Sequence, residues 1–301
     1  MQQIALILVC LLIGIILRWT ERMPDSASKV MGAWVINVAL PAAALHSLRG
    51  IEPTGRWWLA AATPWIGVVL AIVIIVPLSR KFGWSRQRTG ALLLAAGFGN
   101  TSFVGLPMIA AFAGSQWLGL GIVIDLFGSY FALSTLGLVI ATLAASEHFD
   151  WRFVVKRIIT FPPFIAILIA FATDFLARPA WLDHLFGALA DTLTPLALAT
   201  VGFTLRPRDI AGHVAPLIFG LGFRLLAAPL AILLMYLALG QASDPVSKVA
   251  MLEMAMPPML GASIIAMDHD LEPELVAIMI GIGVPLSLFT AWGWWTLIAP
   301  L

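Results

Sequence analysis

The sequence predicts an all-α polytopic membrane protein of ten transmembrane helices, arranged as two inverted five-helix repeats with broken, crossing helices 4 and 9. Three observations predict this fold. The 301 residues are 61% hydrophobic and only 11% charged, with a mean hydropathy of +0.99, whereas soluble proteins contain about 25% charged residues. The chain contains ten apolar segments close to the ~20 residues that cross a bilayer. Two of these segments are interrupted by glycine and proline at matching positions.

The expected spans follow one another with short connections, so no connection is long enough for a soluble domain. They cover residues 2–18, 29–48, 57–78, 88–113, 116–143, 155–177, 182–204, 214–239, 246–267 and 272–298. The first lacks a basic start and a small-residue cleavage site, so we expect a retained helix rather than a signal peptide. We divide the chain into a first repeat (1–144), a cytoplasmic linker (145–154) and a second, inverted repeat (155–301).

The basic residues predict the orientation. The connections after spans 1, 3, 5, 7 and 9 contain twelve lysines and arginines, and the opposite connections contain four. Cytoplasmic loops carry the excess of such residues. We therefore expect a multi-pass protein of the cell (inner) membrane with both termini on the non-cytoplasmic side.

The composition also excludes several functions. A net charge of +1 provides no basic surface for nucleic acid, and the single Cys10 excludes a disulfide framework. The sequence contains no GxxxxGK[ST] phosphate loop and no HExxH motif. We expect neither ATP-driven transport nor an enzyme, and no metal or other cofactor. The acidic turn at 268–274 is interpreted as a solvated helix start.

An internal repeat connects the two halves. Asn37 precedes Pro41 by four residues in the second span, and Asp191 precedes Pro195 by four in the seventh, an offset of 154. The same offset relates the interrupted stretch 97–107 to the interrupted stretch 253–263. Because each half has an odd number of spans, the halves must be inverted. Inverted repeats with broken helices are typical of secondary transporters, although such glycines also permit close helix packing.

The interrupted stretches resemble a known family. Gly-Asn-Thr-Ser-Phe-Val-Gly-Leu-Pro (99–107) and Met-Pro-Pro-Met-Leu-Gly-Ala-Ser (256–263) resemble the auxin efflux carrier family, including its bacterial malonate and malate carriers. The resemblance covers essentially the whole chain. It implies crossed fourth and ninth helices around a central site for small organic anions. The long cytoplasmic loop of the plant carriers is missing here, so the likeness is to the compact bacterial members.

The expected substrate site lies on the two breaks. Asn100, Thr101 and Ser102 occupy the fourth-span break, and the resemblance carries the family's site asparagine onto Asn100; capping of the half-helix is the alternative role. Pro257 and Ser263 occupy the ninth-span break and are assigned to the same site.

Two further residues are substrate candidates. Arg224 lies about ten residues into the eighth span, where a guanidinium can hold a carboxylate with two parallel hydrogen bonds, or can instead pair permanently with Glu253 or Asp191. Asn37 is a candidate because it is the repeat counterpart of Asp191, and a helix-packing hydrogen bond is its alternative role.

Three acidic residues inside spans are candidates for ion coupling, because ionisable groups in membrane segments are costly and usually functional. Glu253 lies four residues before Pro257 and could coordinate a cation or exchange a proton. Asp191 has hydroxyl neighbours that suit a cation. Asp125 and Ser129 share a helix face, where Asp125 serves either proton coupling or a structural hydrogen bond.

These residues predict a secondary active transporter of mono- or dicarboxylates that works by alternating access. We expect H⁺, Na⁺ or the membrane potential to drive it, and we expect the organic anion and the lipid bilayer as its partners. A homodimer is left open. A channel, or a membrane sensor that does not transport, is the alternative function.

Overall fold

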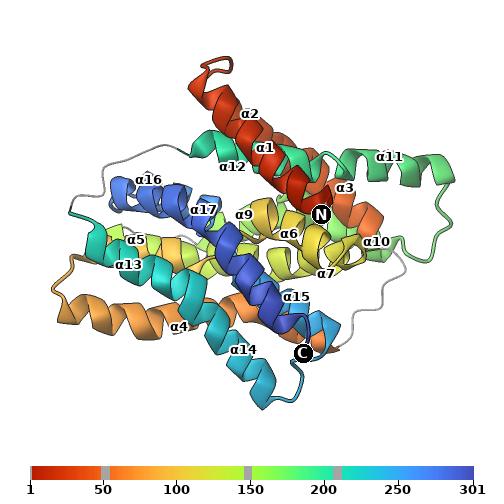
Figure 1. The fold of residues 1–301 in the computed structure, drawn as a ribbon. Helices are drawn as coiled ribbons and strands as arrows, with labels where there is room; N and C mark the ends of the chain where they lie inside the picture. Colours follow the sequence, from red (N-terminus) through yellow and green to blue (C-terminus); the bar gives the residue numbers. More distant parts are fainter. Residues whose placement is uncertain (1, 49–54, 146–150, 206–211) are drawn as a thin grey trace.

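The computed structural model describes residues 2–48, 55–145, 151–205 and 212–301, and every regular element within them is helical (Figure 1). Most are α-helices, η3 is a 3₁₀-helix and the other η segments are π-helices. The elements in chain order are α1 (Gln2–Trp19), α2 (Ala27–Trp34), η1 (Val35–Ala39), α3 (Leu40–Ser47), α4 (Gly55–Lys81), α5 (Arg86–Gly97), η2 (Thr101–Gly105), α6 (Leu106–Phe112), η3 (Ser115–Trp117), α7 (Leu118–Val123), η4 (Ile124–Tyr130), η5 (Leu133–Gly137), α8 (Leu138–Ala145), α9 (Trp151–Ile159), α10 (Pro162–Ala172), α11 (Ala180–Ala190), α12 (Leu193–Thr204), α13 (Val214–Gly222), η6 (Phe223–Ala227), α14 (Ala228–Ala238), α15 (Pro245–Met254), α16 (Leu260–Asp268) and α17 (Pro273–Ile298).

Six helices of the described residues are long and apolar enough to cross a membrane. They match six of the expected spans: Ala27–Ser47, Arg56–Lys81, Ser115–Ala145, Ala180–Thr204, Val214–Ala238 and Pro273–Ile298. The first and sixth expected spans are shorter apolar helices, and the fourth and ninth are interrupted. The expectation of an all-helical, multi-pass membrane protein is thus confirmed.

Prolines explain three of the places where the described helices widen into π-helical turns. A proline lies two residues after η1, η2 and η6, at Pro41, Pro107 and Pro229. Proline lacks the N–H of the helical ladder, and its ring pushes away the carbonyl four residues earlier. The preceding turn therefore opens into i→i+5 bonding, as in the bond from the Ala228 N–H to the Phe223 carbonyl.

The fourth and ninth expected spans are each two half-helices with an extended segment between them. α5 ends at Gly97, Phe98 is extended, and the chain re-enters a helix at Thr101. α15 ends at Met254, and α16 starts at Leu260 after the extended Met259. Pro257 and Pro258 prevent α15 from continuing, because proline disfavours a helical conformation in the residue before it.

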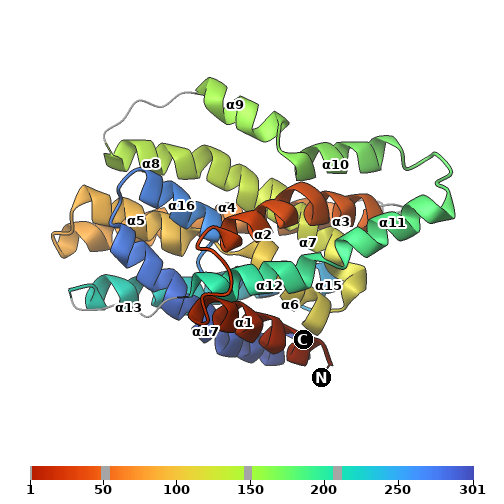
Figure 2. The same cartoon turned by 90° about the horizontal axis from the view of Figure 1, so that it is seen from above.

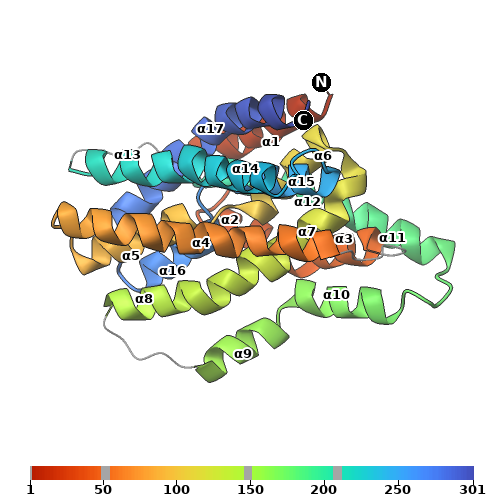
Figure 3. The same ribbon diagram turned by 90° about the horizontal axis from the view of Figure 1, so that it is seen from below.

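The helices form two packed groups. In one group α1 lies along α12, α2 also contacts α12, and α3 contacts α10 and α11 (Figure 2). In the other group α4 contacts α5, η4 and α15, while α5 also contacts α8, α16 and α17 (Figure 3). The groups meet where α12 contacts η2 and α6, and where α3 contacts α7. The breaks in the fourth and ninth spans belong to the second group and lie close to this junction.

Glycines allow α1 and α12 to approach until their backbones touch. A Cβ on Gly14 would overlap the Ala199 carbonyl oxygen, and one on Gly202 would overlap the Leu11 carbonyl oxygen. Small residues permit such close helix packing in membranes.

The sixth expected span differs from the prediction of one helix at 155–177. The structure has α9 and α10 instead, because Pro162 and Pro163 begin a new helix after the extended Phe161. α9 starts at Trp151, inside the stretch expected as a linker, and residues 146–150 of that stretch lie outside the described residues.

Candidate functional site

The two breaks pair with each other through backbone atoms. The Asn100 N–H donates to the Pro257 carbonyl at 2.8 Å, and the Met259 N–H donates to the Phe98 carbonyl at 3.0 Å. Gly99 and Pro258 thereby face each other as in an antiparallel sheet. Non-helical backbone in a membrane is tolerated only when its polar groups find partners or line a cavity, and this pairing satisfies two N–H groups and two carbonyls.

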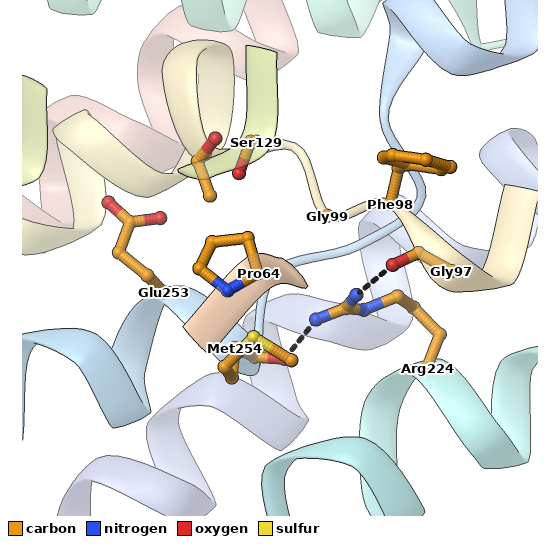
Figure 4. A pocket seen from close by; sticks show the side chains of 9 residues that line it. Pro64, Gly97, Phe98, Gly99, Ser129, Arg224, Glu253 and Met254 are labelled. Atoms are coloured by element: carbon orange, nitrogen blue, oxygen red, sulfur yellow. Dashed lines mark hydrogen bonds between the residues drawn. The ribbon is translucent and has the colours of Figure 1, made fainter. Parts of the chain in front are cut away.

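Arg224 connects the ends of both half-helices. Its side chain is 1% exposed and donates from Nη1 to the Gly97 carbonyl at 3.3 Å and from Nη2 to the Met254 carbonyl (Figure 4). These are the last residues of α5 and α15. The guanidinium also lies against Gly99, where a Cβ would be only 3.2 Å from its Cζ. A cation is favourable at a helix C-terminus, and the Arg224 guanidinium interacts with the C-termini of both α5 and α15.

Asn100 caps the half-helix and keeps one polar group unused. Its Oδ1 accepts from the Phe103 N–H at 3.1 Å, which is the capping role considered from the sequence. Its Nδ2 is buried and has no hydrogen-bond partner among the described residues. The side-chain amide therefore has two N–H donors available.

Asp125 is held by the hydroxyls of the fourth-span break. Its Oδ1 accepts from Thr101 Oγ1 at 2.5 Å and from Ser102 Oγ at 2.6 Å. All three side chains are buried. These bonds tie η4 to η2 and are the kind of structural hydrogen bond that the sequence left open as one role for Asp125.

Glu253 is a buried carboxylate to which no described residue donates a hydrogen bond. It lies in the last turn of α15, is 1% exposed, and neither of its oxygens has a hydrogen-bond partner among the described residues. The carboxylate lies against Gly105, whose added Cβ would overlap Oε2, and near Gly121, whose added Cβ would be 3.7 Å from Oε1. Glu253 and Arg224 do not form an ion pair, so that reading of Arg224 is wrong for the structure described.

A small cavity of about 10 Å³ lies between these groups. Nine buried residues line it: Pro64, Gly97, Phe98, Gly99, Thr101, Ser129, Arg224, Glu253 and Met254. Arg224 and Glu253 approach it from different sides with Pro64 between them (Figure 4). The hydroxyl of Ser129 also lacks a partner among the described residues. A volume of this size accepts about one water-sized particle, so a carboxylate of several carbons requires a more open conformation.

The structure brings some of the expected site residues together and leaves others apart. Ser263 is buried at the start of α16, and its hydroxyl donates to the Met259 carbonyl at 2.9 Å. Asn37 and Asp191 do not reach the cavity. Both are exposed in the described structure, and Asn37 donates to the Ala33 carbonyl at 2.7 Å within its own helix. The structure therefore does not bring these two residues together with the others.

Pro64, Gly105 and Gly121 were not selected from the sequence. Pro64 did give a signal, as a proline in the middle of an apolar run. Gly105 belongs to the interrupted stretch, but only the structure shows that its missing side chain makes room for Glu253.

Broken helices that pair at a buried cavity with charged side chains in its lining are typical of one class of protein, the membrane transporters. The model of the family described as membrane transport protein matches residues 1–295. The chain belongs to this family, which is auxin efflux carrier-like, and the expected resemblance is confirmed. It is a family of membrane transporters.

Two archaeal proteins are similar over nearly their full length. A protein of Methanothermobacter thermautotrophicus named as an uncharacterized transporter is 28% identical over 290 residues, covering 94% of this chain and 93% of its own. Another of that name, from Methanocaldococcus jannaschii, is 23% identical over 305 residues, covering 98% of each chain.

Proposed function

We propose that this membrane transporter is a secondary carrier of small organic anions, most simply mono- or dicarboxylates, that works by alternating access. The observation that carries the proposal is the pairing of the two broken helices at a buried cavity. Asn100 lies between the lining residues Gly99 and Thr101, and its amide N–H groups have no partner among the described residues. Half-helix N-termini and amide N–H groups are suitable donors for a carboxylate.

Asn100, Thr101, Ser102 and Pro257 form the proposed binding region. Asn100 donates to the anion from Nδ2 while Oδ1 keeps the cap. Thr101 and Ser102 begin the half-helix whose positive end faces the break, and Pro257 holds the break open. Ser263 stands at the start of the other re-entering half-helix, α16. Glu253 is the proposed ion-coupling residue, with Asp125 next to it, and H⁺ or Na⁺ is the proposed coupling ion.

A carrier is proposed rather than a non-transporting sensor because the chain belongs to a family of membrane transporters, and the closed cavity agrees with a carrier rather than with an open channel. All nine residues that line it are buried, and it holds about one water-sized particle. A carrier passes through a closed state of this kind between its two open states, whereas a conducting channel keeps a continuous path.

The proposed architecture is ten spans in two inverted repeats, residues 1–144 and 155–301, with both termini outside the cytoplasm. In Figure 1 the α1–α2, α4–α5 and α16–α17 turns lie toward one end of the bundle and both termini toward the other. The positive-inside count supports the former end as cytoplasmic. Tags at Met1 and Leu301 should be accessible in intact spheroplasts, and a protected tag would contradict this orientation.

Uptake into proteoliposomes tests the function. We expect malonate, malate or lactate to enter in a saturable manner and to show counterflow, measured with imposed pH and Na⁺ gradients. Single-channel currents would favour a channel. Transport of another class of solute, with none of the carboxylates moving, would refute the proposed substrate.

A further inference from the structure

The charged side chains buried in the described part of the chain are few and lie together. They are Asp125, Arg224 and Glu253, which are 5%, 1% and 1% exposed. Arg224 contributes one positive charge, because a guanidinium stays protonated. The two carboxylates, when ionised, contribute two negative charges. The group as a whole then carries one uncompensated negative charge.

The positive charge of Arg224 is fixed in place. Its two terminal nitrogens donate to the carbonyls at the ends of α5 and α15, and Gly99 packs against the guanidinium. Moving this side chain toward an anion would leave two helix-end carbonyls without their donors. Arg224 therefore holds the frame of the site with its two terminal nitrogens, while its Nε, which has no hydrogen-bond partner among the described residues, stays in place.

The two carboxylates differ in how they are supported. Asp125 accepts hydrogen bonds from the hydroxyls of Thr101 and Ser102, and such donors stabilise an ionised carboxylate. Glu253 receives no hydrogen bond from any described residue. An unpaired charge in a buried position is very unfavourable, so Glu253 is the carboxylate that needs a bound cation to neutralise it.

The elements around α15 do not supply the missing positive charge. Asp125 on η4 and Arg224 on η6 are the charges that act on Glu253, and Lys248 on α15 itself donates to the Ala299 carbonyl. α15 packs against α4, α6, α7, α14, α17 and η2. Among the described residues of these elements Tyr236 on α14 is a buried titratable group, and the charged side chains are exposed: Arg56, Arg80 and Lys81 on α4 and Glu274 on α17.

We propose that Glu253 binds one monovalent cation, a proton or an alkali ion, and that this cation must bind before the organic anion does. The inference rests on the proposed anion carrier and specifies its coupling. An anion that entered first would add a second uncompensated negative charge to the buried group. With the cation bound, the group is neutral and Asn100 can offer its amide to a carboxylate.

The cavity has the chemistry and the size for this cation. Glu253, Ser129 and Thr101 line the cavity and carry oxygen atoms, and the two Glu253 carboxylate oxygens and Ser129 Oγ have no partner among the described residues. Oxygen atoms are the ligands of hard cations. A space of about 10 Å³ accepts one small ion, or one water that carries a proton to the carboxylate.

The first experiment measures cation binding without any organic anion. The purified full chain is unfolded thermally in detergent, across a pH series in choline chloride and across a NaCl, KCl and LiCl series at fixed high pH. We expect a rise in unfolding temperature with proton or with alkali-ion concentration in the parent, and its loss in Glu253→Gln. Glu274→Gln, the same substitution at an exposed residue, is the matched control and should retain the rise. Dependence on pH alone identifies the proton, and dependence on one salt series identifies the alkali ion.

The second experiment measures the Kd of malonate, malate and lactate at low and at saturating cation. We expect the parent to bind the anion at least about tenfold more tightly with the cation, and the anion to tighten cation binding by the same factor, since such coupling is reciprocal. Glu253→Gln and Asp125→Asn each remove one negative charge, so both should bind the anion with no more than about a twofold cation dependence. Asp125→Asn keeps Glu253 and so provides the same test if Glu253→Gln does not fold.

The outcomes separate the two proposals. If no carboxylate binds but the cation stabilises the parent and not Glu253→Gln, the anion carrier fails while the cation site stands. If the unfolding temperatures of the parent and of Glu253→Gln depend on cations to the same extent, Glu253 is not a cation site. An anion Kd that is the same at every cation concentration overturns the order of binding.

Discussion

Arg224→Lys distinguishes a residue that ties the two half-helices together from one that holds the substrate. Lysine keeps the charge but places one nitrogen where arginine has two, so it can replace only one of the bonds to the Gly97 and Met254 carbonyls. A buried hydrogen bond from a charged group contributes about 1.5–3 kcal/mol. We therefore expect the substitution to lower the free energy of unfolding by about 1.5–3 kcal/mol, roughly 10- to 150-fold in the folding equilibrium.

The assay is denaturant unfolding of the purified protein in detergent, with no organic anion present. Arg88→Lys is a suitable control, because Arg88 pairs with Glu272 at 2.9 Å in a partly exposed position, where such a pair contributes about 0–1 kcal/mol. A variant that is as stable as the parent without anion, yet binds the anion at least about tenfold more weakly, would refute the backbone tie and favour a substrate clamp.

Three further substitutions test the packing and the polar groups of the site. Gly105→Ala places a methyl group where Glu253 Oε2 lies; the carboxylate must move, and gradient-driven accumulation should fall while exchange across the membrane continues. Asn100→Ala removes a helix cap and two amide donors, so we expect stability to fall by about 0.5–2 kcal/mol and anion affinity to fall about tenfold, as measured by unfolding and by equilibrium binding. Gly202→Ala forces a methyl group against the Leu11 carbonyl and should cost about 1–3 kcal/mol of unfolding free energy.

Matched controls exist for the glycine and asparagine changes. A Cβ on Gly32 would have only ordinary contacts at 3.8 Å, so Gly32→Ala should not impair accumulation. Asn37→Ala removes an exposed amide that bonds only within its own helix and should leave anion affinity unchanged. A loss of affinity in Asn37→Ala comparable to that in Asn100→Ala would restore Asn37 to the site.

The breaks could be predicted from the sequence because their causes are local. The prolines at 257 and 258, and the glycines at 97 and 99, weaken the helical ladder at the residues where they stand. They act here as a cluster, whereas the single prolines Pro64 and Pro77 are accommodated within α4. The need of Asp125 for a partner was also predictable, because a carboxylate among apolar residues requires one. Which partner it has depends on how η4 packs on η2, and Thr101 and Ser102 became visible in that role only in the structure.

The differences between the site expected from the sequence and the arrangement in the structure have a common physical origin. Asn37 and Asp191 were grouped with the site because each precedes a proline by one helical turn and because the repeat relates them. A local pattern of this kind places a residue along a helix but does not say which side of the helix faces the centre. The role of Arg224 was likewise hidden, because its partners are backbone carbonyls on two other segments.

The crossing of the two broken helices is built from main-chain atoms. The bonds between the Asn100 N–H and the Pro257 carbonyl, and between the Met259 N–H and the Phe98 carbonyl, do not depend on which side chains these residues carry. Chemistry at the crossing can therefore change while its shape stays the same, provided that the prolines and the arginine remain. A scaffold of this kind can acquire a new substrate by the exchange of a few side chains, because the backbone pairing that stabilises the fold is retained.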